Sequence, residues 1–285
     1  MADKRAPSVR SRQLATVLRR LRDAATMTGE EAAGHLGWSP SKISRIETAQ
    51  TAPSQGDLRR LLDLYDVTGT QRSRLELLGQ TTGQRGWWDA YSDALGPEYT
   101  ALIALEDEAE SVRCYGVQNV PGLLQTERYA HEVARALAPF APPGEIDRRV
   151  QVKMARQRVL TKERPLTLTG VIDEAMMLRM IGGQEVMAEQ LEKLAEVGQR
   201  DNVNIQVLPL DIGSHPGLDG EFSIVSFADL IAPDVVYIEH MTSELYVENE
   251  AAVYRHVMAF DRLRTLALDI TESAAVLKEK AGTLR

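Results

Sequence analysis

Apolar side chains recur at three- and four-residue spacing through the first 80 residues, the period of a helix that buries one face. In the first repeat the apolar positions are Leu14, Val17, Leu18 and Leu21. Comparable repeats follow in residues 28–36, 40–47, 54–65 and 70–78. The pattern predicts an all-α N-terminal domain of five short helices around one core.

Upstream of residue 166 the helical period continues. Residues 99–114 carry apolar side chains at 102, 105, 109 and 112, which predicts one helix with an acidic, solvated second face that includes Glu106. Residues 147–160 form a second predicted helix, rich in arginine. Its positive charge is expected to pair with the acidic helix or with a partner, and contact with DNA is the alternative.

From residue 166 onward, segments in which apolar and polar residues alternate are interspersed with segments of helical spacing. Alternation of apolar and polar residues predicts strands, here at 166–172, 203–208, 222–227, 234–239 and, as a short edge strand, 245–248. Helical spacing predicts helices at 173–180, 186–198 and 250–268, with a last helix ending near Leu284. The expected C-terminal fold is α+β with a mostly antiparallel sheet.

Cap signals surround the second and third helices. Thr28 and Glu31 stand three apart, the spacing of a capping box in which the hydroxyl and the carboxylate each bond a backbone N–H. Gly37 is suited to end the second helix in the left-handed conformation. Ser39 is expected to cap the third helix, with Pro40 at its first position. Two short helices joined by this tight turn predict a helix-turn-helix.

The third helix divides its side chains between core and solvent. Ile43 and Ile46 point inward, and the small polar and basic side chains point outward. Such a helix fits the major groove and can contact bases and phosphates. An ordinary helical hairpin with a solvated face is the alternative, but the ordered combination of signals favours DNA binding. The candidate DNA-binding residues are Arg12, Thr28, Ser39, Ser41, Lys42, Ser44, Arg45 and Gln50.

Residues 12–78, and above all the stretch LGWSPSKISRIETAQTAPS, resemble the lambda-repressor/Cro-like (Xre-type) DNA-binding domain. The resemblance implies that the third helix is the recognition helix. The sequence departs from the family at Pro40 and Gly29, where members often carry glutamines that contact a base and the DNA backbone. Ser41, Lys42 and Arg45 therefore become the main candidates for base contact.

Charge is distributed unevenly along the chain. The net charge of −8 by itself argues against a nucleic-acid binder. Residues 1–62, however, hold 11 Lys and Arg against 6 Asp and Glu, a net charge of +5, whereas the remainder holds 22 against 35, or −13. A basic N-terminal part on an acidic body fits DNA contact through that part alone. Because the excess is modest, a homodimer on an inverted-repeat operator is expected.

A polar, glycine-containing stretch at residues 80–86 marks the predicted domain boundary. The expected organisation is a flexible basic arm at 1–11, a DNA-binding domain at 12–80, a linker or clasp at 81–98 and an α+β domain at 99–285. Trp87, Trp88 and Tyr91 lie at the junction. They are interpreted as a hydrophobic clasp between the domains, with a lid over a ligand pocket as the alternative.

The single cysteine, Cys114, builds neither a disulfide nor a thiolate metal cage, which favours a reducing compartment. Cys114 is expected to be buried; a redox sensor is the alternative. The N-terminal residues show no signal peptide, and no apolar stretch is long enough to span a membrane. A cytoplasmic protein without metal or cofactor is expected.

Polar residues among the predicted strands could form a site in the C-terminal domain. These are Asp173, Glu174, His215, Glu239, His240 and Glu244. No nucleophile motif or phosphate-binding glycine loop accompanies them, so an enzyme ranks third among the possible functions. The candidate ligand-binding residues, with a pocket mouth near the last three, are Trp88, Tyr91, His215, Asp219 and Glu239.

Five phrases behind the N-terminal domain also occur in a recognisable order: VPGLLQTERYA, VIDEAMMLRMIGG, NVNIQVLP, GEFSIVSF and DVVYIE. Together they resemble a large family of actinobacterial antitoxin-like regulators whose C-terminal domain has no settled function. The resemblance implies a transcriptional regulator whose C-terminal domain senses a small ligand or a small partner protein encoded nearby. The alternative is an interaction protein whose DNA-binding domain serves autoregulation.

Overall fold

The computed structural model describes residues 9–81, 87–91, 95–228, 233–241 and 243–285. These residues form two compact units. The head comprises the residues up to 87, and the body comprises residues 88–228 and 234–285. Each unit is described below by itself.

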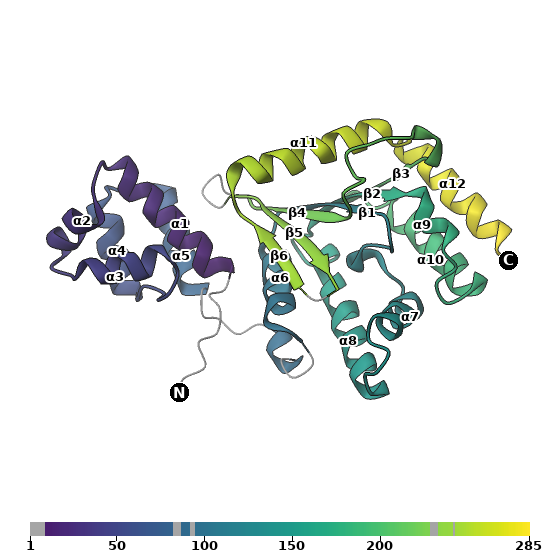
Figure 1. Cartoon of the computed structure of the whole chain (residues 1–285), viewed down its shortest axis with the longest axis horizontal. Coiled ribbons are helices and arrows are strands. Elements are labelled where there is room, and N and C mark those ends of the chain that lie inside the picture. Colours follow the sequence, from purple (N-terminus) through teal and green to yellow (C-terminus); the bar gives the residue numbers. More distant parts are fainter. Residues whose placement is uncertain (1–8, 82–86, 92–94, 229–232, 242) are drawn as a thin grey trace. The chain divides into compact units, whose positions relative to one another are not determined.

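The head is a bundle of short helices (Figure 1). They are α1 (Val9–Ala24), α2 (Gly29–Leu36), α3 (Pro40–Glu47), α4 (Gln55–Leu64) and α5 (Gly69–Thr81). Leucines and isoleucines from every helix meet in one core, including Leu14, Ile43, Leu58 and Leu75. The all-α N-terminal domain that the apolar spacing predicted is confirmed. Because α1 begins at Val9, the last three residues of the predicted arm are helical; the rest lies outside the described residues.

The body combines a mixed sheet with helices. Its helices are α6 (Pro97–Glu108), α7 (Glu127–Leu137), α8 (Pro143–Arg156), α9 (Glu174–Leu178), α10 (Gln184–Val197), α11 (Glu250–Leu266) and α12 (Ile270–Thr283). Short 3₁₀ turns lie at η1 (Trp87–Tyr91), η2 (Gly122–Leu124), η3 (Gln157–Leu160) and η4 (Leu210–Ile212). The strands are β1 (Ser111–Gly116), β2 (Thr167–Asp173), β3 (Val203–Leu208), β4 (Phe222–Ser226), β5 (Val235–His240) and β6 (Ser243–Val247).

Within the described residues the strands form one sheet of order β3-β2-β1-β4-β5-β6. β1 pairs in parallel with β2, which pairs in parallel with β3. The pairs β1–β4, β4–β5 and β5–β6 are antiparallel, so the α+β class and the mostly antiparallel sheet are confirmed. β6 is an edge strand, as predicted.

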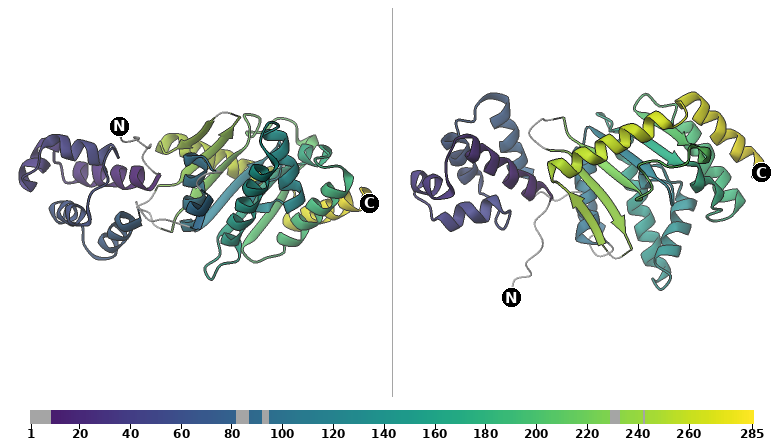
Figure 2. Two further views of the ribbon diagram at one scale, coloured as in Figure 1. Left: turned by 90° about the horizontal axis from the view of Figure 1, so that it is seen from below. Right: turned by 45° about the horizontal axis from the view of Figure 1, so that its top comes forward.

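Different helices cover the two faces of the sheet (Figures 1 and 2). α11 packs on one face, where Phe260 and Leu263 join Tyr115, Val171 and Ile224 in a buried cluster. α6, α7 and α8 lie on the opposite face. Side chains alternate between the faces along each strand, so the residues of one strand contribute to two different environments.

The predicted helix at 99–114 is wrong in its second half. α6 ends at Glu108, and residues from Ser111 form β1, a central strand. The prediction of a solvated acidic face is also wrong for Glu106, which is 3% exposed. The expectation that the basic helix pairs with the acidic one is confirmed, because Arg156 of α8 forms an ion pair with Glu106.

Candidate functional site

Both ends of α2 are defined by local interactions. The Thr28 hydroxyl accepts the backbone N–H of Glu31 at 3.2 Å, and the Glu31 carboxylate accepts the backbone N–H of Thr28 at 2.8 Å. Gly37 ends α2 with a φ of +67°, a conformation that glycine adopts without strain. The predicted capping box and glycine stop are confirmed: the first begins α2, and the second ends it three residues before α3 begins.

The outer face of α3 is polar and its inner face is apolar. Ile43 and Ile46 are buried in the head core, whereas Ser41, Ser44 and Arg45 are exposed. Among the described residues, no side chain forms an ion pair with Arg45. The outward orientation that the sequence predicted for these three side chains is confirmed.

Ser39 stands at the N-cap position before Pro40, but its hydroxyl does not bond the helix backbone. Its Oγ lies 3.0 Å from the Oγ of Ser41 instead. The prediction that the Ser39 side chain caps α3 is therefore wrong. Pro40 already removes one of the N–H groups that would require a cap.

Lys42 is less available than its outward position suggests. Its Nζ lies 2.8 Å from Asp57 Oδ1 and 3.8 Å from the centre of the Trp38 ring. Burial raises the pKa of Asp57, but hydrogen bonds to Lys42 and Ser54, together with the Lys42 charge, outweigh this and hold the pKa below its ordinary value. A contact between Lys42 and DNA would have to compete with this ion pair.

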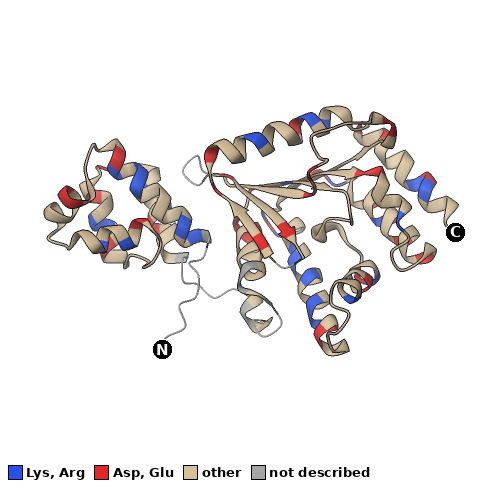
Figure 3. Cartoon of the chain, viewed as in Figure 1, with Lys and Arg blue, Asp and Glu red and all other residues tan. Residues whose placement is uncertain are grey.

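The remaining candidates of the head lie around α3 in the sequence. Arg12 is half-buried on α1, Thr28 is exposed at the start of α2, and Gln50 is exposed just after α3. Figure 3 shows that basic and acidic positions are interspersed on the head.

Arg22 has a positioning role that the sequence did not reveal. Arg22 lies near the end of α1, and its side chain is only 11% exposed. The guanidinium donates two hydrogen bonds to Glu47, at 2.7 and 2.9 Å, and thereby joins α1 to the last residue of α3. Only the tertiary structure brings these residues together, so no local pattern could have identified the pair.

The body contains a cavity of about 1130 Å³ on the face of the sheet that α6, α7 and α8 cover. Its floor includes Cys114 of β1 and Ser223 of β4, and its walls include residues of α6, α8, β5 and β6. The volume lies slightly above the range of about 300–1,000 Å³ that is typical of small-molecule sites.

A buried ion pair lines the cavity between α6 and α8. Arg156 donates from Nη2 to Glu106 Oε1 at 2.8 Å and from Nε to the other carboxylate oxygen, and it also donates to the Tyr99 hydroxyl at 2.8 Å. Burial alone would lower the pKa of Arg156, but the Glu106 charge raises it, so the guanidinium stays charged. The two charges largely neutralise each other.

Lys153 and Glu221, two other ionisable residues of the cavity lining, have shifted pKa values. Lys153 Nζ donates to Gln125 Oε1 at 3.1 Å. Burial and the nearby Arg156 charge lower the pKa of Lys153 to about 8, against the opposing effect of Glu239. Burial likewise raises the pKa of Glu221. Of the polar residues predicted from the sequence, Glu239, His240 and Glu244 line this cavity.

His215 belongs to a different cluster. The Tyr115 hydroxyl donates to Asp173 Oδ2 at 2.8 Å, and His215 Nε2 lies 3.8 Å from the same oxygen. Tyr115 also packs against Phe222 in the α11-side core. His215 is not among the residues that line the large cavity, and neither is Asp219. The structure therefore separates His215 from Glu239, which the sequence had placed at one pocket mouth.

The junction aromatics pack within the body. Trp88 is 7% exposed and forms an apolar cluster with Ile103 and Val152, against which Tyr91 packs. Among the described residues, the lining of the cavity includes neither Trp88 nor Tyr91. Their arrangement is that of core residues rather than of a pocket lid.

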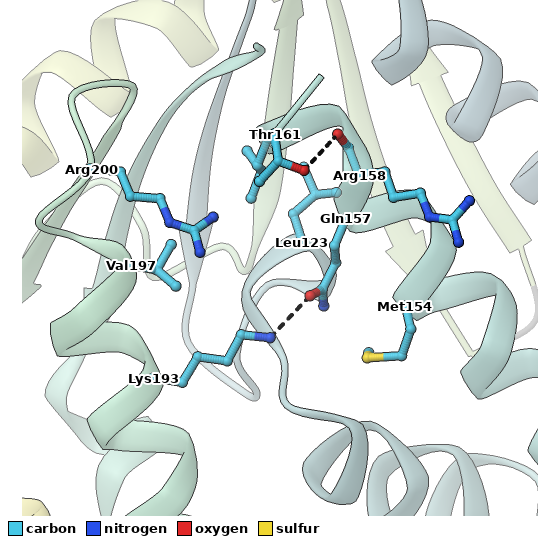
Figure 4. A pocket seen from close by; sticks show the side chains of 9 residues that line it. Leu123, Met154, Gln157, Arg158, Thr161, Lys193, Val197 and Arg200 are labelled. Atoms are coloured by element: carbon cyan, nitrogen blue, oxygen red, sulfur yellow. Dashed lines mark hydrogen bonds between the residues drawn. The ribbon is translucent and has the colours of Figure 1, made fainter. Parts of the chain in front are cut away.

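A smaller pocket of about 240 Å³ lies between η3 and the end of α10 (Figure 4). Its charged lining residues are Arg158, Lys193 and Arg200. Lys193 Nζ donates to Gln157 Oε1 at 3.0 Å and to the Gln125 carbonyl at 2.8 Å. Burial, aided by the Arg200 charge, lowers the pKa of Lys193. This lining favours anions over cations.

The described residues contain no group of three or more His, Cys, Asp or Glu side chains that could hold a metal ion. Cys114 is free and buried, as expected. Burial raises its thiol pKa to about 12, so the reactive thiolate is scarce at neutral pH. None of the described helices has the length and apolar character needed to cross a membrane.

Comparison with known families assigns both parts of the chain. A model described as a helix-turn-helix domain matches residues 13–75. The head is thus a helix-turn-helix domain, which indicates a DNA-binding regulator. A model described as a domain of unknown function (DUF5753) matches residues 99–279, and the chain belongs to this family. No curated protein and no solved structure matches the chain.

Proposed function

We propose that this protein is a sequence-specific transcriptional regulator of the Xre type, in which the head binds double-stranded operator DNA and the body senses a small molecule. The observation that carries the proposal is α3, a helix anchored in the head core by Ile43 and Ile46, with Ser41, Ser44 and Arg45 exposed on its outer face. The body cavity supports the sensing role.

Arg45 is the principal base-reading residue in this proposal. Its guanidinium is exposed and can donate two hydrogen bonds to the edge of a guanine in the major groove. Ser41 and Ser44 are short enough to let the helix approach the bases. Thr28 and Gln50 flank α3 and contact the phosphate backbone, and Arg19 supplies further positive charge from α1.

The test compares a base-reading arginine with a phosphate-contacting one. Binding sites are selected from random duplexes with the purified full chain, and affinity is then measured for selected and scrambled duplexes at several salt concentrations. Arg45→Ala should weaken binding to the selected site by about 1–3 kcal/mol with little effect on the scrambled one. Arg19→Ala should weaken both and reduce the dependence on salt.

Two results would contradict the proposal. One is a wild-type protein that selects no sequence and ignores duplexes at low salt. The other is an Arg45→Ala variant that keeps full discrimination between selected and scrambled sites.

The second candidate is the antitoxin-like interaction protein, which binds a small partner protein through the body. One observation favours it: Tyr254 and Met258, one turn apart on α11, are 64% and 51% exposed. Apolar side chains at this spacing form a stripe that a partner, or a second copy in a homodimer, can cover. Co-purification of a stoichiometric small protein that Tyr254→Ser and Met258→Ser together abolish would support this candidate.

A further inference from the structure

The large cavity of the body has walls of opposite charge. Figure 3 shows basic positions along α8 and acidic positions on the β5–β6 hairpin. Arg149, Lys153 and Arg156 lie at helical spacing on α8 and all line the cavity. Glu239 of β5 and Glu244 of β6 line it from the sheet.

On the basic wall, Lys153 is the cation available to a ligand. Arg156 is neutralised by Glu106, and Arg149 bonds Glu145 one turn away at 2.7 Å. Lys153 contacts an amide oxygen, and no carboxylate of a described residue lies within ion-pair distance of its ammonium group. An anion bound here would therefore meet a charge that the protein itself has not neutralised.

On the acidic wall, two carboxylates stand directly opposite each other. Glu239 and Glu244 are partners in the antiparallel register of β5 and β6. Like charges at opposed positions disfavour a sheet, so this hairpin brings two acidic side chains to one wall of the cavity. The pKa of Glu221 is raised mainly by burial, and the negative charge of Glu239 raises it further.

A buried hydroxyl gives independent evidence that this wall is incomplete. Tyr237 is 6% exposed and stands two residues before Glu239, on the same face of β5. Its hydroxyl is buried in the cavity wall without a hydrogen-bond partner among the described residues. Buried polar groups normally have a partner, so a polar ligand group would complete the wall.

The two walls face each other without joining. The charge of Glu239 is close enough to affect the pKa of Lys153, yet the two side chains form no ion pair in the described structure. We propose that the cavity binds a small zwitterion, an amino acid or a short peptide, with its ammonium group against Glu239 and Glu244 and its carboxylate against Lys153.

This inference rests on the proposed sensing role of the body, but the binding itself is measurable without DNA. The full chain is mixed with a pool of the free amino acids, a random tripeptide pool, and matched pools that are N-acetylated or C-amidated. Thermal shift identifies the binding pools, and calorimetry then gives affinities for single members. A zwitterion should bind, and masking either end should weaken binding about tenfold or more.

Variants assign each end of the ligand to its wall. In Glu239→Gln, the zwitterion should no longer bind more tightly than its N-acetylated form. In Lys153→Gln, it should no longer bind more tightly than its C-amidated form. Lys153→Arg, which keeps the charge, should retain the tighter binding of the zwitterion. Glu163→Gln and Lys278→Gln alter exposed charges outside the cavity and should behave like wild type.

The inference is overturned if no zwitterionic pool binds, if the masked pools bind equally well, or if both glutamine variants keep the wild-type preferences. A protein that still selects a DNA sequence in any of these cases remains a regulator, so the two failures are distinguishable. If a zwitterion binds without changing operator affinity, the binding site stands and its regulatory role falls.

Discussion

Lys153 and Arg156 lie one turn apart on α8 and line the same cavity wall, but only Arg156 has a carboxylate partner among the described residues. Arg156 is stabilised by two bonds to Glu106, and removing either partner of such a buried pair typically costs about 3–5 kcal/mol. Lys153 has only an amide oxygen and suffers the Arg156 charge as well. Arg156 therefore maintains the structure, whereas the charge of Lys153 is a burden unless a ligand offsets it.

The cost of burying the charged Lys153 side chain predicts that the stability of the body depends on pH. The pKa of Lys153 is about 8 in the folded chain, below its ordinary value of 10.5. Between these values the unfolded chain holds the additional proton, so stability should rise with pH across this window. Lys153→Met should stabilise the ligand-free body by roughly 1–2 kcal/mol at pH 7 and remove its share of that rise.

Urea unfolding at pH 7 and pH 10 measures this effect. Lys278→Met, which replaces an exposed lysine of α12, serves as the control and should keep the wild-type pH dependence. Equal slopes for Lys153→Met and the wild type would show that the folded and unfolded chains hold the Lys153 proton equally well.

At the scale of elements, the turn between α2 and α3 depends on one backbone conformation. Gly37 has a φ of +67°, and a Cβ there would meet no other atom within 4 Å. Gly37→Ala should destabilise the head by about 1–2 kcal/mol through backbone strain alone. Gly34→Ala is a matched control, because Gly34 is helical with equally open surroundings and should gain roughly 0.5–1 kcal/mol.

Hydrogen exchange of the head amides in the full chain measures both changes. Loss of protection in Gly37→Ala together with a gain in Gly34→Ala is the expected result. Similar losses in both variants would mean that side-chain volume, and not the sign of φ, limits this turn.

The sequence predicted the elements that carry local signals and missed those that do not. Thr28, Glu31 and Gly37 signal helix ends by their own chemistry, so α2 was predictable. β1 was missed because Leu102, Leu105, Ala109 and Val112 keep a helical spacing across the end of α6. No glycine or proline marks that end, and pairing with β2 and β4 overrides the local pattern.

At the scale of the whole molecule, the candidate site shows the same limit. Glu239 was identified as a polar residue among the predicted strands, and it lines the cavity. The sequence could not show that His215 lies with Tyr115 and Asp173, because the face on which a loop packs depends on the sheet order. Lys153 was also missed, since a single lysine on a basic helix has no local signal.

The modest charge of the head leads to a prediction for the assembled regulator. With a net charge of +5 in residues 1–62, one head is expected to bind an isolated half-site weakly. A homodimer should occupy an inverted repeat whose half-site centres lie about 10–10.5 base pairs apart. Insertion of about five base pairs between the half-sites should lower affinity far more than insertion of a full turn.

Footprinting and sedimentation of the protein–DNA complex measure spacing and stoichiometry together. A monomer that protects a single half-site at full affinity would contradict the dimer. A selected site that tolerates any spacing would show that the two heads are not held in a fixed relation.

The register of the sheet also sets an order of events during synthesis. β1 is complete at Gly116, but its antiparallel partner β4 begins at Phe222, about a hundred residues later. The core of the head uses residues 14–75 and has all its contacts long before that point. The nascent chain therefore contains a complete head before β4 is available to pair with β1. A truncated product that ends between these two strands would keep the helix-turn-helix domain but lack the antiparallel half of the sheet.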